Sequence, residues 1–434
     1  MGYCKRCIMP DTKPDLYFDE EGVCIACKAS DYKHDKIDWK ARKKEFENLL
    51  DRYRSRDPSK YDCIVPTSGG KDSTYQAFVM KHVFNMNPLC VHFEPTYPSE
   101  IGRQNLENMR NLGLDVLSFK PNPHIYTKIC REAFTKVGDH EWPNHVGIFT
   151  VPVRVAVQYN IPLLLWGENS QLEYGGPMDA AKKEALNRRW LEEFGGLLGL
   201  RVNDLNHVGI SEADLKPYVY PSEDELKKVG ISGVFLGYYF KWDARRQVEL
   251  VKKVGFNVRT GPVEGTYVNY ENLDDEIVSI HDYFKYIKFG FGRASDHTSL
   301  DIRNSRLSRA DALKLLAKYD GKLFSDRVAM FCKRFAMSKQ EFFTVVEKYA
   351  NKSIFKVDDN GKLIWENGQL VNLMLQKELE RNHIVSSQFK DTSPILTQID
   401  NIVKNQITKE GYVTGLIDAK NFDTKFGNWQ HQFS

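Results

Sequence analysis

Long apolar runs are missing from this sequence of 434 residues. No stretch of about 18 consecutive apolar residues is available for a membrane span, and the N-terminal Met-Gly-Tyr-Cys-Lys-Arg-Cys lacks the apolar core of a signal peptide. An excess of one charge is missing as well, since 61 basic residues face 58 acidic ones and the net charge is +3. We therefore expect a cytoplasmic protein with no membrane partner. The charge balance also argues against nucleic acid as a partner, although it is compatible with a local basic groove.

Two signatures of glutamine hydrolysis are also absent. A glutaminase needs an activated cysteine nucleophile, but residue 2 is glycine, so removal of the first methionine would not expose a cysteine. No Gly-x-Cys-x-Gly elbow with a later His and Glu occurs either. If the chain uses ammonia from glutamine, a separate protein must release it.

A cluster of cysteines near the start of the chain is the first positive signal. Cys4, Cys7, Cys24 and Cys27 form two Cys-x-x-Cys pairs with sixteen residues between them. This spacing predicts a structural Zn²⁺ site with four thiolate ligands, in which metal binding stabilises a segment too short for its own core. Redox dithiols and an iron–sulfur cluster are the alternatives. We expect the remaining cysteines to be small buried apolar residues, namely Cys63, Cys90, Cys130 and Cys332.

A glycine-rich loop between a strand pattern and a helix pattern is the second signal. The apolar segment 61–67 runs into Ser68-Gly69-Gly70-Lys71-Asp72-Ser73-Thr74. Two glycines permit turn conformations closed to other residues, and the first amides of the following helix would bind an anion. The Walker pattern differs, because it has four residues between its glycines. Ser68–Ser73 instead matches SGGxDS and resembles the PP-loop ATPases, which split ATP into AMP and pyrophosphate.

The side chains of this loop have natural roles in binding ATP. Lys71 could neutralise phosphate charge, and Asp72 could hold Mg²⁺ or fix the loop. The hydroxyls of Ser73 and Thr74 could donate to phosphate. A glycine-rich turn with a surface lysine and ordinary helix caps is the alternative.

Strand and helix patterns alternate from residue 58 to about 272. We expect strands at 61–67, 88–93, 115–119, 161–167 and 232–240, and helices at 73–84, 101–112, 151–158 and 244–254, the last capped by Asp243. This alternation predicts an α/β fold with a parallel, Rossmann-like sheet, as in PP-loop (adenine nucleotide α-hydrolase-like) proteins. Ligands gather at the carboxyl ends of such strands, where Gly167, His92 and Phe93 also fall. His92 and Phe93 would lie beside the adenine, unless the histidine is merely packed.

Composition divides the chain into five segments. We expect a zinc knuckle at 1–32, a helical linker at 33–57, the α/β domain at 58–272 with a charged insertion at about 178–230, a helical substrate or partner region at 273–358, and a tail or subdomain of weak periodicity at 359–434. In the helical region we expect a helix at 274–289, a polar loop at 290–297, a helix at 309–319 capped by Ser308, and a capping box formed by Ser338 and Glu341.

Several motifs together resemble one family. They are Cys4-x-x-Cys7 with Ile8-Met9-Pro10-Asp11-Thr12, the glycine-rich loop, Gly167-Glu168-Asn169-Ser170, Glu173-Tyr174-Gly175-Gly176, Phe240-Lys241-Trp242-Asp243 and Ile287-Lys288-Phe289-Gly290-Phe291-Gly292-Arg293-Ala294. Over residues 1 to about 355 the sequence is similar to the N-acetyl sugar amidotransferases of the WbpG and PseA type. The resemblance implies an enzyme that uses ATP, Mg²⁺ and ammonia to convert an acetamido group of a nucleotide-activated sugar into an acetamidino group. Such enzymes act in the biosynthesis of bacterial surface polysaccharide, O-antigen or flagellin glycan.

The resemblance also implies roles for single residues. The catalytic candidates are Lys71, Asp72, Glu168 and Lys241, of which Glu168 could orient ammonia or take its proton. The candidates for binding the sugar and its diphosphate are Asn169, Tyr174, Asp243 and Arg293, and further candidates are Asp296, His297 and Arg303. Each of these could instead be a solvated charge or a helix cap. A separate glutaminase of the histidine-biosynthesis type is implied as the source of ammonia.

Two other functions fit parts of the sequence. A PP-loop enzyme that thiolates or ligates a tRNA base could also carry an N-terminal zinc knuckle, but thiolation normally needs a persulfide cysteine or a cysteine pair, and the charge balance is mild for an RNA-binding protein. The knuckle could also be the working part of a scaffold in a glycan-assembly complex.

Overall fold

A mostly parallel sheet forms the centre of the protein. The computed structural model describes residues 1–169, 173–175, 185–186, 202, 204–205 and 209–426. The parallel strands are β1 (Cys63–Thr67), β2 (Pro88–Phe93), β3 (Asp115–Phe119), β4 (Leu163–Trp166) and β6 (Ser232–Phe235), in the order β3-β2-β1-β4-β6, and β5 (Ala185–Leu186) pairs antiparallel with β6. The predicted α/β fold with a parallel sheet is therefore confirmed.

The order of the strands reverses at β1. Cys63 of β1 lies opposite Pro88 of β2 on one side and Leu163 of β4 on the other. The chain first builds the sheet outward through β2 and β3 and then returns to add β4 and β6 on the opposite side. Such a reversal opens a crevice at the carboxyl ends of the strands, which is where ligands bind in this class of fold.

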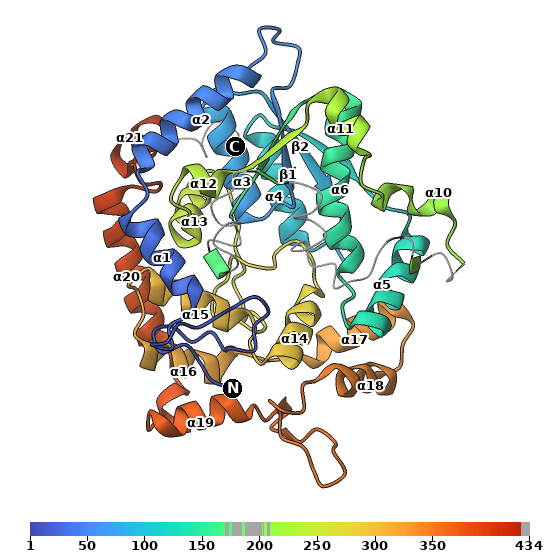
Figure 1. Cartoon of the computed structure of the whole chain (residues 1–434), viewed down its shortest axis with the longest axis vertical. Coiled ribbons are helices and arrows are strands. Elements are labelled where there is room, and N and C mark those ends of the chain that lie inside the picture. Colours follow the sequence, from blue (N-terminus) through green and yellow to red (C-terminus); the bar gives the residue numbers. More distant parts are fainter. Residues whose placement is uncertain (170–172, 176–184, 187–201, 203, 206–208, 427–434) are drawn as a thin grey trace.

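Helices cover both faces of the sheet (Figure 1). α6 (Trp142–Tyr159) packs on β1, β2 and β4, and α5 (Pro123–Val137) packs on α6. α3 (Lys71–Phe78) packs on β1, continues as a π-helical turn (Val79–Val83), and is covered by α13 (Ala244–Lys253). α4 (Glu100–Asn111) lies against β3. Every residue of β2 and β4 is buried, which explains why these strands read as continuous apolar runs.

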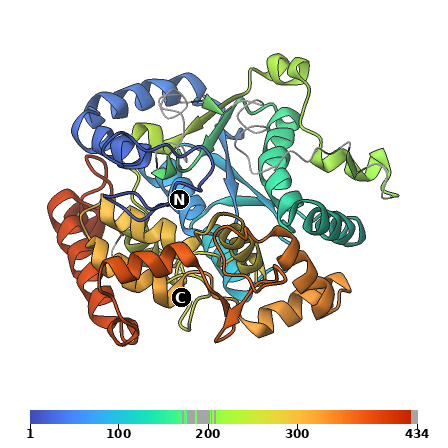
Figure 2. The same ribbon diagram turned by 60° about the horizontal axis from the view of Figure 1, so that its bottom comes forward.

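The N-terminal segment lies beside the later helices of the chain. It carries α1 (Ile25–Asp35) and α2 (Trp39–Tyr53), and Asp38 caps α2 by accepting hydrogen bonds from two backbone amides at 3.0 and 3.1 Å. Figure 2 shows its first residues, in dark blue, next to the yellow helices that follow the sheet. The Thr12 hydroxyl donates to the Phe289 carbonyl at 2.5 Å.

A helical region follows the sheet. It comprises α14 (Val278–Phe289), α15 (Arg293–Arg303), α16 (Arg309–Tyr319), α17 (Ser325–Phe335) and α18 (Lys339–Tyr349). The predicted Ser308 cap and the Ser338–Glu341 capping box are both present. The prediction of a helix from 274 was wrong, because Asp275 accepts hydrogen bonds from the amides of Ile277 and Tyr97 at 2.6 and 2.8 Å and holds the residues before Val278 out of the helix.

The prediction of a polar loop at 290–297 was also wrong, since α15 begins at Arg293. The carboxylate of Asp320 accepts hydrogen bonds from the amides of Gly292 and Ala294 at 2.9 and 3.1 Å and from the Ser295 hydroxyl at 2.6 Å. The N-terminal amides of α15 are thus capped by a residue 28 positions away from Gly292, and local sequence patterns do not contain this partner.

Two expectations near residue 240 need correction. β6 ends at Phe235 and a helical turn, α12 (Leu236–Tyr239), follows, because the Gly237 amide donates to the Gly167 carbonyl at 2.9 Å and so turns the chain across the end of β4. Asp243 precedes α13 without a side-chain capping bond. Its carboxylate instead pairs with the buried guanidinium of Arg306.

The C-terminal segment belongs to the same core. It contains the hairpin β7 (Trp365–Glu366) and β8 (Gln369–Leu370) and the helices α19 (Leu373–Arg381), α20 (Ser393–Glu410) and α21 (Ala419–Phe426). The rings of Phe422 and Phe426 lie 5.9 and 5.2 Å from that of Phe78 in α3, and α20 packs on α13. Residues 393–426 therefore pack on α3 and α13, the helices on one face of the sheet.

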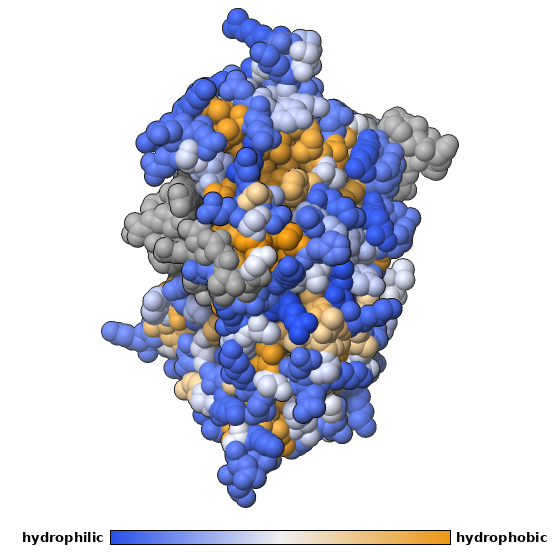
Figure 3. All heavy atoms as spheres, turned by 90° about the vertical axis from the view of Figure 1, so that its right-hand side faces the viewer, coloured by the Kyte–Doolittle hydropathy of each residue, from blue (hydrophilic) through white to orange (hydrophobic). Residues whose placement is uncertain are grey.

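About half of the predicted insertion at 178–230 lies outside the described residues. Its described parts are β5, α10 (Glu212–Leu215), a 3₁₀ turn (Lys216–Tyr218) and α11 (Glu223–Val229). Figure 3 shows the side of the molecule that carries α6, where the largest group of apolar side chains lies in the upper half. Among the described residues, no helix combines the length and the apolar character needed to cross a bilayer.

Candidate functional site

The glycine-rich loop lies at the carboxyl end of the central strand. β1 ends at Thr67 and α3 begins at Lys71, with Gly70 as its N-terminal cap residue. Gly69 has a φ of +78°, and a Cβ at this position would lie 2.9 Å from the Gly102 carbonyl oxygen. Only glycine fits both the left-handed backbone and this close approach.

The hydroxyls of the loop brace the loop itself. Thr74 Oγ1 and Ser73 Oγ donate to the Gly70 carbonyl at 2.9 and 3.2 Å, and Ser73 Oγ accepts from the Ser68 amide at 3.4 Å. The Gly70 amide donates to Ser68 Oγ at 3.3 Å. The loop is therefore held in one conformation before any ligand arrives.

A cavity of about 370 Å³ opens beside this loop. Its lining includes Ser68, His92, Glu94, Gly102, Ser118 and Asp274, from the ends of β1, β2 and β3 and from α4. Burial lowers the pKa of His92 to about 4, so this ring is neutral near pH 7. The volume lies within the range of about 300–1,000 Å³ that is usual for small-molecule pockets.

Phe93 lies on the other side of β2 from this cavity, because consecutive strand residues point to opposite faces. Its ring is 2% exposed and stacks on Phe119 at 5.9 Å. A Cβ on Gly147 of α6 would lie only 2.4 Å from the same ring. The structure thus brings His92 to the cavity and packs Phe93 against α6.

Lys71 points into the protein and pairs with two carboxylates. Its ammonium lies 2.6 Å from Asp72 Oδ2 and 2.6 Å from Glu271 Oε1, and the residue is 6% exposed. Burial opposes the charged ammonium, but the charges of Asp72 and Glu271 outweigh burial and raise the pKa of Lys71. Asp72 Oδ1 is buried without a hydrogen-bond partner in the described part of the chain, so this oxygen could bind a cation such as Mg²⁺.

Glu168 joins this charged group from the end of β4. Burial, followed by the charge of Asp72, raises the pKa of Glu168 to about 8. A carboxylate with this pKa can both hold and release a proton near neutral pH. A Cβ on Gly167, the residue before it, would lie 2.6 Å from Gln76 Nε2, so a larger residue here would displace the Gln76 side chain.

A second, narrow cavity begins at Glu168 and extends between α13 and α15. Its lining includes Glu173, Tyr174, Asp243, Tyr270, Glu271 and His297. His297 Nδ1 lies 2.7 Å from Thr266 Oγ1, and its Nε2 lies 3.7 Å from Glu271 Oε1. Arg306 lowers the pKa of Asp243 to about 2 in spite of burial, which acts in the opposite direction.

The remaining candidates are not part of the lining of this cavity. Arg293 Nε lies 3.4 Å from Asp282 Oδ2, and Asn169 is buried, its carbonyl accepting a bond from the Glu173 amide at 3.1 Å. Lys241 points toward the C-terminal segment, where its ammonium lies 3.8 Å from Glu410 Oε2. Asp296 accepts a hydrogen bond from Lys285 at 2.5 Å.

Several residues of this cavity carried no sequence signal. Arg245 forms a two-pronged ion pair with Asp301, its Nε and Nη2 each donating at 2.8 Å. Tyr270 and Glu271 lie in an irregular segment without periodicity. Glu173 lies within the Glu173-Tyr174-Gly175-Gly176 motif, which by itself indicates no role for its carboxylate. Only the folded structure brings these residues close to the loop at position 70.

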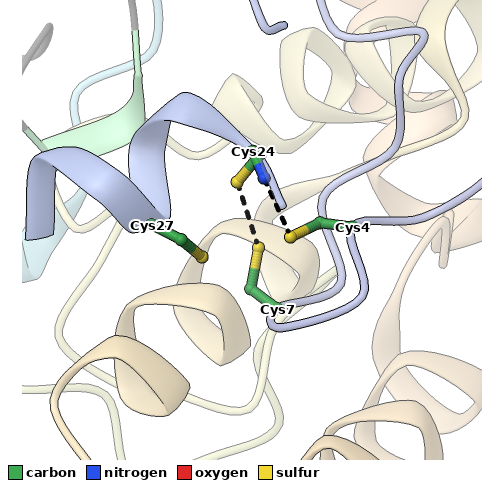
Figure 4. Close-up of side chains that lie close together, drawn as sticks. All are labelled: Cys4, Cys7, Cys24 and Cys27. Atoms are coloured by element: carbon green, nitrogen blue, oxygen red, sulfur yellow. Dashed lines mark hydrogen bonds between the residues drawn. The ribbon is translucent and has the colours of Figure 1, made fainter. Parts of the chain in front are cut away.

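The four clustered cysteines converge on one point (Figure 4). All four are buried, and their sulfur atoms lie within 4.8 Å of one another. Cys4 Sγ accepts hydrogen bonds from the amides of Cys24 and Arg6 at 3.2 and 3.4 Å, which favours its thiolate form. This donor set can bind a structural metal ion. The four scattered cysteines are buried, as predicted.

The cysteine cluster touches the candidate site directly. Arg303 donates to Cys7 Sγ at 3.7 Å and to the Glu173 carbonyl at 2.8 Å. Lys33 of α1 donates to both carboxylate oxygens of Glu173 at 2.6 and 2.8 Å, and to the Trp242 carbonyl at 2.8 Å. The N-terminal segment thus fixes one wall of the second cavity.

Comparison with known proteins finds a family match in the second half of the chain. Residues 264–372 match the family described as "LPS biosynthesis protein WbpG-like, C-terminal domain". A curated relative, the uncharacterized protein MJ1599 of Methanocaldococcus jannaschii, is 30% identical over 110 residues. That match covers 25% of this chain and 38% of the relative.

Proposed function

We propose that the protein is an ATP-dependent amidotransferase that converts an acetamido group of a nucleotide-activated sugar into an acetamidino group. The observation that carries this proposal is the glycine loop beside a cavity of about 370 Å³, together with the buried charged group that Lys71, Asp72 and Glu168 form at the end of the loop. The WbpG-like domain supports a role in lipopolysaccharide biosynthesis. O-antigen or flagellin glycan assembly in the cytoplasm would be the corresponding setting.

The chemistry proceeds in two steps. The acetamido oxygen attacks the α-phosphorus of ATP and pyrophosphate leaves, so that a poor leaving group becomes an adenylate. Ammonia then adds to the same carbon, AMP departs with the former amide oxygen, and a proton is lost to leave the amidine. The loop amides at the start of α3 and the ammonium of Lys71 would bind the phosphates.

Two residues have specific tasks in this scheme. Asp72, whose Oδ1 lacks a hydrogen-bond partner among the described residues, would hold Mg²⁺, which stabilises the charge of departing pyrophosphate when bound. Glu168, with its pKa of about 8, would accept the proton released when ammonia adds. Asp243, Tyr174, Asn169 and Arg293 would bind the sugar and its diphosphate, and a structural Zn²⁺ would occupy the four cysteines.

The ammonia would come from a separate glutaminase, because no glutaminase nucleophile is recognisable in the sequence. With ATP, Mg²⁺ and the nucleotide-sugar present, the purified protein should therefore use ammonium as its nitrogen source without glutamine or a glutaminase. The ammonium of Lys241 lies near Glu410 rather than in the cavity, so Lys241 would help to position the C-terminal segment.

The test is an assay with ATP, Mg²⁺, ammonium and candidate nucleotide-sugars, followed by mass spectrometry. A substrate with heavy oxygen in its acetamido group should pass that label to AMP while the sugar gains nitrogen. Asp72→Asn should abolish AMP formation, whereas Asp51→Asn, at an exposed position of α2, should leave it unchanged. AMP that forms without the heavy label would contradict the proposal, as would full activity of Asp72→Asn.

A further inference from the structure

A second group of metal-ligating side chains lies apart from the cysteines. Asp139 precedes α6, His145 lies in the first turn of α6, and His281 lies in α14. Their ligand atoms all lie within 4.8 Å of one another. No sequence motif pointed to these residues, and the proposed amidotransferase reaction does not use them.

The distances within this group suit one shared ion. His281 Nδ1 lies 2.8 Å from Asp139 Oδ1, and His145 Nδ1 lies 3.8 Å from Asp139 Oδ2. Two ligands of one tetrahedral Zn²⁺ lie about 3.3 Å apart, since each bond is about 2.0–2.2 Å long. The observed separations lie on either side of this value, so small rotations of the side chains would complete the geometry.

One ring nitrogen in the group lacks a partner. His145 Nδ1 is buried and has no hydrogen-bond partner among the described residues. Leaving a buried polar atom unsatisfied costs about 1–3 kcal/mol, and a metal ion at this point would satisfy it. The Glu141 amide donates to Asp139 Oδ1 at 3.0 Å and orients the carboxylate, as outer-sphere partners of metal ligands do.

The charges around the group favour a cation. Asp139 and Glu141 are 3% and 1% exposed. The nearby ammonium of Lys288 donates to the carbonyls of Val137 and Gly138 at 2.6 and 3.0 Å. Glu141 Oε1 also lies 3.1 Å from His140 Nε2. With all of these imidazoles neutral, two buried carboxylates face one ammonium, and the local charge is negative.

The group lies at the edge of the sheet where ligands gather. The start of α6 lies near the carboxyl end of β2, because Phe93 is the last residue of β2 and its ring lies close to Gly147 of α6. The side chains of His145 and His281 are 23% and 26% exposed, so one side of the group is open.

We propose that Asp139, His145 and His281 bind a divalent transition-metal ion with at least one coordination position left open. Two imidazoles and one carboxylate favour ions of the Zn²⁺, Fe²⁺ or Co²⁺ class over Mg²⁺, which prefers oxygen ligands. Three protein ligands are typical of sites that also bind water or a substrate atom. This inference goes beyond the proposed function and does not depend on it.

The experiment counts metal ions on the full-length protein. Metal is removed under reducing conditions, Co²⁺ is added, and the bound metal is measured by elemental analysis together with the absorption spectrum. The cysteine site gives intense thiolate-to-cobalt absorption, whereas the Asp139 site contributes only weak ligand-field bands. Wild-type protein should bind two equivalents. His145→Gln and His281→Gln should each bind one and keep the thiolate absorption.

The control is His124→Gln, at an exposed position of α5, which should still bind two equivalents. Circular dichroism verifies that each variant is folded, and if one histidine variant fails to fold the other gives the same test. One equivalent in the wild-type protein would overturn the proposal, and so would two equivalents in a folded His145→Gln or His281→Gln variant.

Discussion

Replacing Lys71 by methionine should destabilise the folded protein by about 3–5 kcal/mol, the usual cost of breaking a buried ion pair by removal of one partner. The ammonium lies 2.6 Å from each of two carboxylates, and the Lys71 side chain is 7% exposed. Methionine has a similar length and shape, so the loss of packing should be small. The cost comes from leaving Asp72 and Glu271 buried without their cation.

Urea-induced unfolding, followed by circular dichroism, measures this change at pH 7. The matched control is Lys43→Met, because Lys43 is exposed and lies 3.9 Å from Glu47 on the surface of α2. Exposed pairs of this kind contribute about 0.5 kcal/mol or less. The contrast between the two variants isolates the effect of burial.

A double variant separates the ion pair from other effects. In Lys71→Met combined with Glu271→Gln, one uncompensated carboxylate is removed, so the double variant should be at least about 1 kcal/mol more stable than the sum of the single changes predicts. The reasoning would be refuted if Lys71→Met cost less than about 1 kcal/mol or if the two changes were additive.

The pH dependence gives a further check of the same pair. Burial acts to raise the pKa of Glu271, but Lys71 and then His297 outweigh burial and lower it. The stability from this pair is therefore fully present above the ordinary glutamate pKa of about 4.3 and is lost as the pH falls below that value. The difference between wild type and Lys71→Met should shrink in the same range.

Three other changes have defined outcomes. The pKa of Glu168 is raised to about 8, so the stability of the wild-type protein should fall as the pH rises from about 5 to 8. Glu168→Gln should flatten this part of a plot of melting temperature against pH. Parallel plots for the two proteins would refute the assignment. Gly147→Ala should lower the free energy of unfolding in urea by about 1–3 kcal/mol, because the added Cβ clashes with Phe93, although alanine by itself favours helices. In the control Gly261→Ala the added Cβ meets no atom, and the stability should change little. Equal effects of the two changes would contradict the packing argument. Arg303→Met should weaken Zn²⁺ retention against a competing chelator, because it removes the hydrogen bond to Cys7 Sγ, and should lower the melting temperature, because it leaves the Glu173 carbonyl unpaired. Arg381→Met, at an exposed position, should do neither.

Local chemistry made much of the fold predictable. The strands 88–93 and 115–119 have the predicted bounds. The first of them is buried throughout, and buried parallel strands leave continuous apolar runs between turn residues. The capping box at Ser338 and the convergence of the four cysteines also followed from spacing alone. The predictions were wrong where a residue distant in the sequence determines the local structure. Asp320 caps the start of α15, and Arg306 pairs with Asp243, which therefore does not cap α13.

The sequence by itself determined the alternating elements, the glycine loop between β1 and α3 and the cysteine cluster, because each depends on residues close together in the chain. Only the tertiary structure decided that Lys71 pairs with Glu271, that Arg303 joins the cysteine cluster to the wall of the second cavity, and that Asp139, His145 and His281 face one another. The physical reason is that burial, pairing of charges and metal geometry depend on distances in space, and these contacts bring together residues up to 296 positions apart in the sequence.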